Sequence, residues 1–598
     1  MSVQSTKQEE IRTLTICLGN EPETLYPLAA SSRSAWSVLE AIYDGPVDII
    51  EGKPVPVILT ALPSRENGTL TSVPVQVNTG DLVADTRGNL TSLAAGTRVF
   101  PSGCASPDCA ISWDGSTPLS LDQISARFTL KPNLTWSDGA PLTADDALFS
   151  YEIASDPATP TDTRLIEQTA AYTVIDALTL QWQGVPGLSV ADVSGYFPFP
   201  LPRHAWGGLS AAELLNNSLS SRAPLGWGAY VLSEWKPGQS IRLTRNPRYF
   251  RASEGLPRFD TLTFKFISGT TNDALAAVKG GICDMVLPEA IGMDQFAVVS
   301  AGKADSSVKV NLKPGNAITF LAFGIKPTAY DDSYYPFGSD RPDLFGDTRT
   351  RQAIAQCINR QAILQAILPG EERIPYYFIS PENPFNLAQE SVLPYDPQAA
   401  IALLELAGWR DFDQNPQTAR TALNVKNVPD WRKLSITLVA TDSVVDTLIA
   451  QRVQNDLAAC GIPVTIINLP AEQAYQAGPE GVIFGRRFDL AVLSMRVGGQ
   501  APCGLFTSDE IPMESNYWMG SLRGGNFSGF TNAELDAACA LIVEAGANVA
   551  AAESASAVVL RTAAEELPFI PLFYQPAVLV TSSDACSINF TLQGRSTL

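Results

Sequence analysis

Histidine is almost absent from this 598-residue chain, which holds a single one, His204. Catalytic triads, HExxH metal sites and histidine proton relays all need this residue type at a fixed spacing from a partner. In LPRHAW, Pro202 and Trp206 flank the histidine and favour a packed turn. No GxxxxGKS/T phosphate loop occurs, and the GWG at 226–228 is too short for a dinucleotide-binding fingerprint. The sequence therefore lacks the signatures of these enzyme classes.

Basic clusters and long hydrophobic runs are missing as well. The 62 acidic residues outnumber the 41 basic ones, the net charge is −21, and no run of Lys or Arg offers a footprint for phosphates. Nucleic acid is therefore not expected as a partner. No apolar run reaches the roughly 18 residues that a membrane-spanning helix requires. The opening MSVQSTKQEE has no apolar core of an export signal, so the chain is either not exported or a mature segment that restarts with Met.

Cysteine spacing indicates one local pair. Nine cysteines are present without a CxxC motif, so we expect no zinc site, no other metal and no cofactor. Only Cys104 and Cys109 lie close together, in CASPDC within a loop rich in Gly, Pro and Ser, which suits a disulfide outside the cytosol. The other cysteines lie in apolar stretches such as AIAQCIN and ACALIV, and we expect buried free thiols there.

Asp145 and Asp146 stand side by side in LTWSDGAPLTADDALFSYEIASDP and invite a reading as a catalytic carboxylate pair. Adjacent residues on a helix point about 100° apart, so the two cannot share a proton. The SDG at 137–139 is a turn signal, because Asp can bond its own backbone and Gly allows a positive φ. Thr143 is an N-cap candidate, and Asp146 three residues later completes a capping box. We interpret these acids as turn and cap residues.

The predicted secondary structure changes along the chain from mostly strands to mostly helices. Strand patterns dominate up to about residue 268, including a hairpin around the Pro-Gly at 237–238. The stretch 64–122 is rich in Gly, Ser and Thr, and we interpret it as an addition to the main fold. Helical patterns prevail from 270 onward. LSITLVAT and VTIINL flank the helical DTLIAQRVQNDLAACG, which predicts a crossover between parallel strands, with FDLAVLSM as a third strand.

Cap signals mark the helices of the second half. We expect a helix over 348–364 capped by Asp347, and another that begins at Pro397 after the cap Asp396. Thr531 and Glu534 form a second capping box. The apolar run PFIPLFYQPAVLVT at 568–581 is long enough to cross between two lobes.

Seven phrases follow one another along the chain: GNEPETLYPLAAS with its following helix, FTLKPNLTWSDGAPLTADDALFSYE, LPRHAW, GWGAYVLSEWKPGQSIRLTRNPRYF, GDTRTRQAIAQCINRQAI, PYDPQAAIALLELAGW and FSGFTNAELD. In this order they resemble the extracytoplasmic solute-binding proteins of family 5, the binding proteins of peptide-type ABC importers. The similarity covers nearly the whole chain except much of 64–122.

The resemblance implies an α/β fold of the two-lobed periplasmic-binding-protein type (class II), with a hinge between the lobes and an extra strand-rich subdomain on the first lobe. We expect lobe I to comprise 12–48, 190–268 and 577–598. The subdomain would be 49–189, with 64–122 as an insertion, and lobe II would be 269–576.

The resemblance also implies a function without catalysis: the substrate-binding receptor of an ABC importer. Such a receptor captures a peptide-like or other small polar solute in the interlobe cleft and delivers it to a membrane permease and its ATPase. We expect a monomer outside the cytoplasm, held at the membrane only by an anchor absent from this sequence, such as a lipid-bearing cysteine just before Ser2 of an exported precursor.

In this family the loop before the first helix, the RNP segment, the strand corresponding to FDLAVLSMRVGG and the late crossing strand approach the ligand. Asn246, which precedes Pro247, also reads as a turn residue, and Arg33 as a solvated charge at a helix start. The candidates that the resemblance carries over are Ser31, Ser32, Arg33, Asn246, Met495, Arg496, Gly498 and Tyr574.

One departure bears on the ligand. Peptide-binding members commonly place an Asp after the FDL-type strand to pair with the peptide's α-amino group, and here the corresponding position is Gly498. A buried ammonium without that carboxylate would lack a partner. Arg33 and Arg496, if both face the cleft, would instead favour a carboxylate, a phosphate or an acyl oxygen. The single histidine disfavours a nickel-type role.

Two other classes stay open. A carboxylate-based hydrolase, such as a glycosidase, requires two carboxyl groups facing each other across a cleft at a fixed gap, and the pair at 145–146 reads as a cap. A chaperone-like or sensory relative would hold peptides without feeding a transporter.

Overall fold

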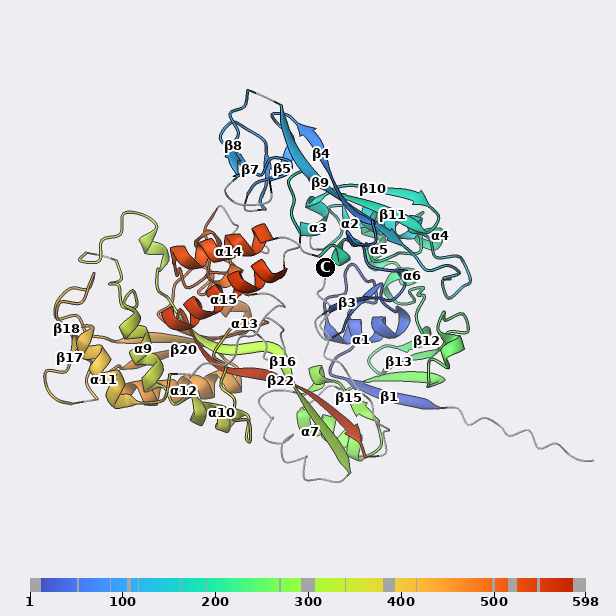
Figure 1. Cartoon of the computed structure of the whole chain (residues 1–598). Helices are drawn as coiled ribbons and strands as arrows, with labels where there is room; N and C mark the ends of the chain where they lie inside the picture. Colours follow the sequence, from blue (N-terminus) through green and yellow to red (C-terminus); the bar gives the residue numbers. More distant parts are fainter. Residues whose placement is uncertain are drawn as a thin grey trace, which may run out of the picture.

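A single mixed sheet runs through the molecule. The computed structural model describes residues 12–583 except 51–52, 87, 105–108, 117, 162, 191, 268–269, 292–306, 339, 380–392, 416, 497–500, 515–523 and 546–548. Figure 1 shows two lobes, with β16 and β22 running from one toward the other. Within the described residues the sheet order is β12 (Tyr230–Lys236), β13 (Ser240–Arg245), β14 (Thr261–Phe266), β1 (Thr13–Leu18), β15 (Met285–Val286), β22 (Phe569–Ser582), β16 (Val308–Phe323), β21 (Leu490–Arg496), β19 (Ile436–Thr441) and β20 (Val464–Leu469).

The strands β16 and β22 are the long central pair of this sheet. They pair antiparallel from Val308 opposite Ser582 to Ala322 opposite Phe569. Their register shifts just after the point where Pro314 stands opposite Pro576. Proline has no N–H to give to the ladder, so the pair is weakest in hydrogen bonds at this point. The predicted crossing run at 568–581 is confirmed as β22.

Lobe I surrounds β1 and a tryptophan-rich core. Trp136, Trp182, Trp206 and Trp227 are all buried there, and the hairpin predicted around the Pro-Gly at 237–238 is confirmed as β12 and β13. Its helices are α1 (Arg33–Ile42), α2 (Ala144–Ala154), α3 (Arg164–Glu167), α4 (Arg203–Trp206), α5 (Ala211–Asn216) and α6 (Ser218–Ser221).

A four-stranded antiparallel sheet and three short strand pairs lie beside this core. The region 77–121 has a small core of its own around Val83, Val99 and Trp113. Figure 1 shows β4, β5, β7 and β8 projecting from the top of the lobe. The strands are β10 (Thr169–Asp176), β11 (Thr179–Gly184), β9 (Leu119–Thr129) and β4 (Leu70–Val77), with the pairs β2 (Val47–Ile50) and β3 (Lys53–Pro56), β5 (Leu82–Ala84) and β6 (Leu90–Ser92), β7 (Arg98–Val99) and β8 (Ile111–Ser112).

The capping interpretation of the two adjacent aspartates is confirmed. The backbone N–H of Thr143 donates to Asp146 Oδ2 at 2.9 Å at the start of α2. Asp146 is buried and also accepts from the N–H of Arg203 at 3.0 Å, whereas Asp145 is exposed and pairs with the Arg203 guanidinium. Burial raises the pKa of Asp146, although hydrogen bonds from backbone N–H groups act against the rise. The two carboxylates thus contact different groups of Arg203, the backbone N–H for Asp146 and the guanidinium for Asp145.

Lobe II contains the predicted crossover. The strands β19 and β20 are parallel and joined by α12, and β21 pairs parallel with β19, as the sequence pattern predicts. The remaining elements around this half are α7 (Thr271–Lys279), α9 (Thr348–Cys357), α10 (Arg360–Ile367), α11 (Pro397–Leu406), α12 (Val444–Ala458), α13 (Ala471–Ala474), α14 (Ala533–Ala545), α15 (Val549–Glu566), β17 (Trp409–Arg410) and β18 (Thr421–Ala422).

Two helix predictions in this half need correction. The expected single helix over 348–364 is two helices, because the side chain of Asn359 caps a new start by accepting from Ala362 N at 2.9 Å. The cap of α14 is Asn532 and not Thr531. The Oδ1 of Asn532 accepts from the backbone N–H groups of Glu534 and Leu535. The hydroxyl of Thr531 instead accepts from Lys326 Nζ at 2.7 Å.

The cysteines are the largest correction. Cys104 and Cys109 form the short disulfide that their spacing suggests. The expectation of free thiols is wrong for Cys17 with Cys283, Cys357 with Cys460, and Cys503 with Cys539, which form three further disulfides. Their sequence separations of 266, 103 and 36 residues leave no local pattern to read. Cys586 lies outside the described residues.

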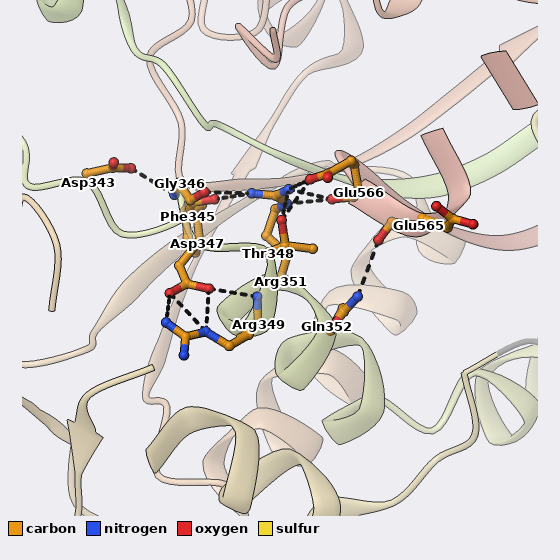
Figure 2. Close-up of polar contacts among 10 residues, drawn as sticks. All are labelled: Asp343, Phe345, Gly346, Asp347, Thr348, Arg349, Arg351, Gln352, Glu565 and Glu566. Atoms are coloured by element: carbon orange, nitrogen blue, oxygen red, sulfur yellow. Dashed lines mark hydrogen bonds and ion pairs between the residues drawn. The ribbon is translucent and has the colours of Figure 1, made fainter. Parts of the chain in front are cut away.

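One buried arginine joins the start of α9 to the end of α15. Arg351 is 2% exposed, and Figure 2 shows its guanidinium among the carbonyl of Phe345, Thr348 and Glu566. Its Nη1 donates to Phe345 O at 2.6 Å, and its Nη2 donates to Glu566 Oε2 at 3.0 Å. Burial lowers the pKa of this guanidinium, while the Glu566 carboxylate opposes the change. Because β22 begins three residues after Glu566, the arginine fixes where that strand starts.

We expect Arg351→Ala to lower the free energy of unfolding by about 3 kcal/mol, since the carbonyls of Phe345 and Glu566 lose their guanidinium donor and the Glu566 carboxylate keeps only the Thr348 hydroxyl. Arg349→Ala is the matched control, because its guanidinium is half exposed and pairs with Asp347, as Figure 2 shows, and with the carbonyl oxygen of Leu406 at 3.1 Å. That change should cost less than about 1 kcal/mol. Urea unfolding followed by circular dichroism measures both values, and equal losses would contradict the assigned role of Arg351.

The disulfides should stabilise the fold according to the loop that each closes. Removing the bond that spans 103 residues, in Cys357→Ala/Cys460→Ala, should cost about 4–5 kcal/mol. Removing the bond that spans five residues, in Cys104→Ala/Cys109→Ala, should cost about 2 kcal/mol. Thermal unfolding of both variants beside the parent under oxidising conditions tests this order, and a reversed order would contradict it.

Candidate functional site

The loop before α1 is organised by one carboxylate. Glu23 Oε1 accepts from the backbone N–H groups of Ser31 at 2.8 Å and Ser32 at 3.0 Å, and its Oε2 accepts from the Ser32 hydroxyl. Ser32 is also the N-cap of α1, because its Oγ accepts from Ala35 N at 3.1 Å. Arg33, the first residue of α1, has an exposed side chain. The two serines therefore have a structural role, whether or not they also contact a ligand.

The electrostatics of Glu23 follow from these contacts. Partial burial by itself would raise the pKa of Glu23, but the hydrogen bonds from Ser32 and Ser31 outweigh it and hold the pKa below its ordinary value. A carboxylate with a lowered pKa contributes stability above its ordinary pKa and loses that contribution as the pH falls through the folded value.

The candidates on the central strands fall on two opposite faces of the sheet. Ile318 of β16 lies between Met495 of β21 and Tyr574 of β22, whereas the next residue, Ala317, lies between Arg496 and Gln575. Because side chains alternate along a strand, Met495 and Tyr574 share one face and Arg496 shares the other with Gln575. A ligand on either face therefore meets only one of the two sets.

The face with Met495 and Tyr574 is largely occupied by lobe II itself. The Tyr574 hydroxyl lies 2.7 Å from the carbonyl oxygen of Ile379 and 3.2 Å from that of Tyr377, so it ties β22 to the segment after α10. Burial raises the pKa of Tyr574. Both candidates pack against the apolar core of this lobe, half-buried.

The face with Arg496 carries a polar cluster that the sequence reasoning missed. Gln575 Nε2 donates to Ser494 Oγ at 3.0 Å and to Thr319 Oγ1 at 3.2 Å, and the two hydroxyls lie 2.9 Å apart. The exposed Arg496 stands two residues beyond Ser494 on the same face. A sequence signal exists, since each of these three residues is a polar position inside an otherwise apolar strand, in AITFLAF, LAVLSM and PLFYQP.

The other candidates lie elsewhere. Asn246 is 1% exposed, donates through Nδ2 to Gly228 O at 2.8 Å and accepts from Arg248 N at 3.0 Å. It therefore acts as a turn residue, which was the alternative reading. Gly498 lies outside the described residues. His204 Nε2 lies 2.8 Å from Asp138 Oδ2 at the surface of lobe I, consistent with a packed turn.

Neither a metal-binding cluster nor a membrane-spanning helix is found among the described residues. They contain no group of three or more His, Cys, Asp or Glu side chains placed to hold a metal ion. Their helices include none with both the length and the apolar character needed to cross a bilayer.

The chain belongs to a family of binding proteins. The model of the middle region of bacterial extracellular solute-binding proteins, family 5, matches residues 105–499. The oligopeptide-binding protein AppA of Bacillus subtilis is 28% identical over 349 residues, which is 56% of this chain and 56% of AppA. A putative ABC transporter peptide-binding protein of Brucella ovis is 26% identical over 318 residues, 52% of this chain and 54% of the relative. The chain thus aligns with about half the length of these curated relatives.

Solved structures confirm the two-lobed α/β fold. AppA of Bacillus subtilis in complex with a nonapeptide superposes with a TM-score of 0.58 at 18% identity, covering 97% of both chains. The ABC transporter substrate-binding protein CtaP of Listeria monocytogenes gives a TM-score of 0.65 at 18% identity, over 96% of this chain and 94% of CtaP. At this identity the likeness concerns the fold.

Replacing Ser32 should reveal its double contact. We expect Ser32→Ala to cost about 1 kcal/mol of stability at neutral pH, because α1 loses its cap. The loss should shrink as the pH falls through the lowered pKa of Glu23, because the protonated carboxyl no longer accepts the hydroxyl strongly. Ser31→Ala is the control for the cap, since the Ser31 hydroxyl also donates to Glu23, at 3.3 Å, but caps no helix. Urea unfolding at neutral and at acidic pH measures this, and a pH-independent loss would contradict the role of Glu23.

Proposed function

We propose that this protein is the substrate-binding receptor of an ABC importer, which encloses a peptide-like or other small polar solute between its lobes and delivers it to a membrane permease. The observation that carries the proposal is the crossing pair β16 and β22 between two lobes, in a chain of the family 5 binding proteins. Named relatives include oligopeptide-binding and peptide-binding proteins. Two lobes joined by a few strands can close on a ligand and present a changed surface to a membrane partner.

In this proposal the ligand meets the polar face of the crossing strands. Arg496 is exposed there, and the neighbouring Gln575 uses its Nε2 for Ser494 and Thr319. On lobe I, Ser31, Ser32 and Arg33 lie at the start of α1, which Figure 1 draws on the side of lobe I nearest to lobe II. Met495 and Tyr574 support the strands from the opposite face.

The chemistry of this face favours a ligand that presents an oxygen anion or an acyl oxygen. A guanidinium offers a planar fork of donors to such a group. The described residues of β21 provide no carboxylate that would pair with a free α-amino group on this face. We therefore propose a ligand whose amino terminus is blocked or absent in preference to a free-amino peptide.

The disulfides support a place outside the cytoplasm. Four disulfide bonds lie within the described residues, and such bonds persist in oxidising compartments. We propose a monomer that is exported, tethered to the membrane by an anchor outside this fold, and performs no chemistry on its ligand.

The ligand is best identified first and then tested by variants. Native mass spectrometry of protein purified without refolding should show the mass of a retained solute. Calorimetry with that solute should give an affinity about tenfold to a hundredfold weaker for Arg496→Ala, as expected for a lost hydrogen bond to a charged group. Arg487→Ala removes an exposed arginine just before β21 and should leave the affinity unchanged.

Two further measurements separate the proposal from its alternatives. Small-angle X-ray scattering should show a smaller radius of gyration with the solute than without it. Identical curves with every retained or added solute would contradict the receptor function, and turnover of the solute would favour a hydrolase. Tight binding of free-amino peptides that Arg496→Ala leaves unchanged would contradict the proposed ligand chemistry alone. A peptide-holding chaperone or sensor would bind its ligand without stimulating the ATPase of a reconstituted importer.

A further inference from the structure

Exposed aromatic side chains gather at one place on lobe II. Phe337, Phe412 and Trp431 are 60%, 56% and 67% exposed, although aromatic rings elsewhere in the described chain are mostly buried. Phe412 and Trp431 are ring neighbours, with centroids 5.3 Å apart and planes 30° apart. Large exposed apolar patches usually mark a binding surface.

Two of these rings, Phe337 and Trp431, line a groove of about 630 Å³, which we call the aromatic groove. A groove of this volume is within the range of ligand sites. One wall comes from the segment before α9 and the other from the segment before β19, and its lining residues include Phe337, Asp340, Asp430, Trp431 and Arg432.

The aromatic groove is separate from the interlobe site. Trp431 is anchored by its backbone N–H, which donates to Ala422 of β18 at 2.9 Å. Figure 1 places β17 and β18 at the end of lobe II farthest from lobe I. The groove therefore lies away from the crossing strands.

The backbone holds the indole of Trp431 in its outward position. Trp431 has a φ of +70°, in the left-handed region that residues with side chains rarely adopt. Such a conformation persists only when the surrounding structure enforces it, and it concentrates at functional sites. Here it keeps a large aromatic ring exposed beside the groove.

Polar groups stand among the rings. Asp340 Oδ2 accepts from Tyr335 N at 2.6 Å and Asp430 Oδ1 from Asn424 N at 2.8 Å, so each carboxylate is oriented and keeps one oxygen without a partner in the described part of the chain. The exposed guanidinium of Arg432 likewise makes no hydrogen bond or ion pair to a described residue. The groove thus offers hydrogen-bond acceptors and donors beside aromatic faces.

We propose that the aromatic groove is a second binding site and that its ligand is a saccharide. The C–H faces of a sugar ring stack on the electron-rich faces of Trp431 and Phe337. Its hydroxyl groups both donate and accept, so they satisfy the spare oxygens of Asp340 and Asp430 together with the guanidinium of Arg432. A lipid surface fits less well, because insertion of the rings would desolvate both carboxylates.

Calorimetry with soluble chitohexaose, cellohexaose and maltohexaose, together with co-sedimentation on purified peptidoglycan, tests the proposal. We expect at least one of these probes to bind, and Trp431→Ala or Phe337→Ala to weaken binding about tenfold or more. Binding of a soluble hexasaccharide would indicate a free sugar as the ligand. Binding to peptidoglycan alone would indicate a cell-wall glycan.

Two controls keep this result specific. Tyr395→Ala removes an exposed aromatic side chain that does not line the groove. Gln575→Ala alters the polar cluster on the crossing strands. Neither change should affect saccharide binding. Circular dichroism checks that each variant is folded. Absence of binding to all four probes, or binding that survives loss of Trp431, would overturn the proposal. Trp431-dependent binding to phosphatidylcholine vesicles or to a second copy of the chain, without saccharide binding, would overturn it as well.

Discussion

The antiparallel pairing of β16 with β22 is the constraint on which the rest of the structure depends. The two strands share one sheet with β1 and β15 at one end and with β21 and β19 at the other, so both lobes are extensions of the same ladder. Arg351 fixes the start of β22 at the end of α15. Midway along the β16–β22 pairing, the opposed prolines 314 and 576 provide no backbone N–H for hydrogen bonds. A strand pair that is held at its end and interrupted by two register shifts is suited to rigid lobes that move relative to each other.

The same pairing decides what a ligand can touch. Side-chain alternation on β16, β21 and β22 separates Arg496 and Gln575 from Met495 and Tyr574, and the hydroxyl of Tyr574 is already engaged by lobe II. In the proposed receptor, specificity would therefore rest on a short row of polar positions in apolar strands. A few such groups are sufficient for recognition when closure excludes water, because hydrogen bonds are stronger in a low dielectric.

Much of the fold is predictable from the sequence because its signals are local. The caps Asp347 and Asp396 and the capping box of Thr143 with Asp146 lie within a few residues of the helices they start. The break at Asn359 was missed because an asparagine inside an amphipathic pattern gives no warning that its side chain will cap a new helix. The three long-range disulfides were missed because the partners meet only after the chain has folded.

The candidate site was less predictable than the fold. Family resemblance gave Asn246 and Arg496 equal standing as candidates, and only tertiary contacts distinguish a satisfied turn side chain from an exposed guanidinium. The polar cluster of Thr319, Ser494 and Gln575 was readable as polar positions in apolar strands, yet its meeting on one face required the register of three strands.

The bond between Cys17 and Cys283 has a consequence for the integrity of the molecule. It closes a covalent ring that contains almost all of lobe I and its projecting subdomain. A protease that cuts once within this ring, for example in an exposed loop of the projecting tip, leaves both fragments linked. The nicked protein would remain a single molecule until a reductant opened the ring.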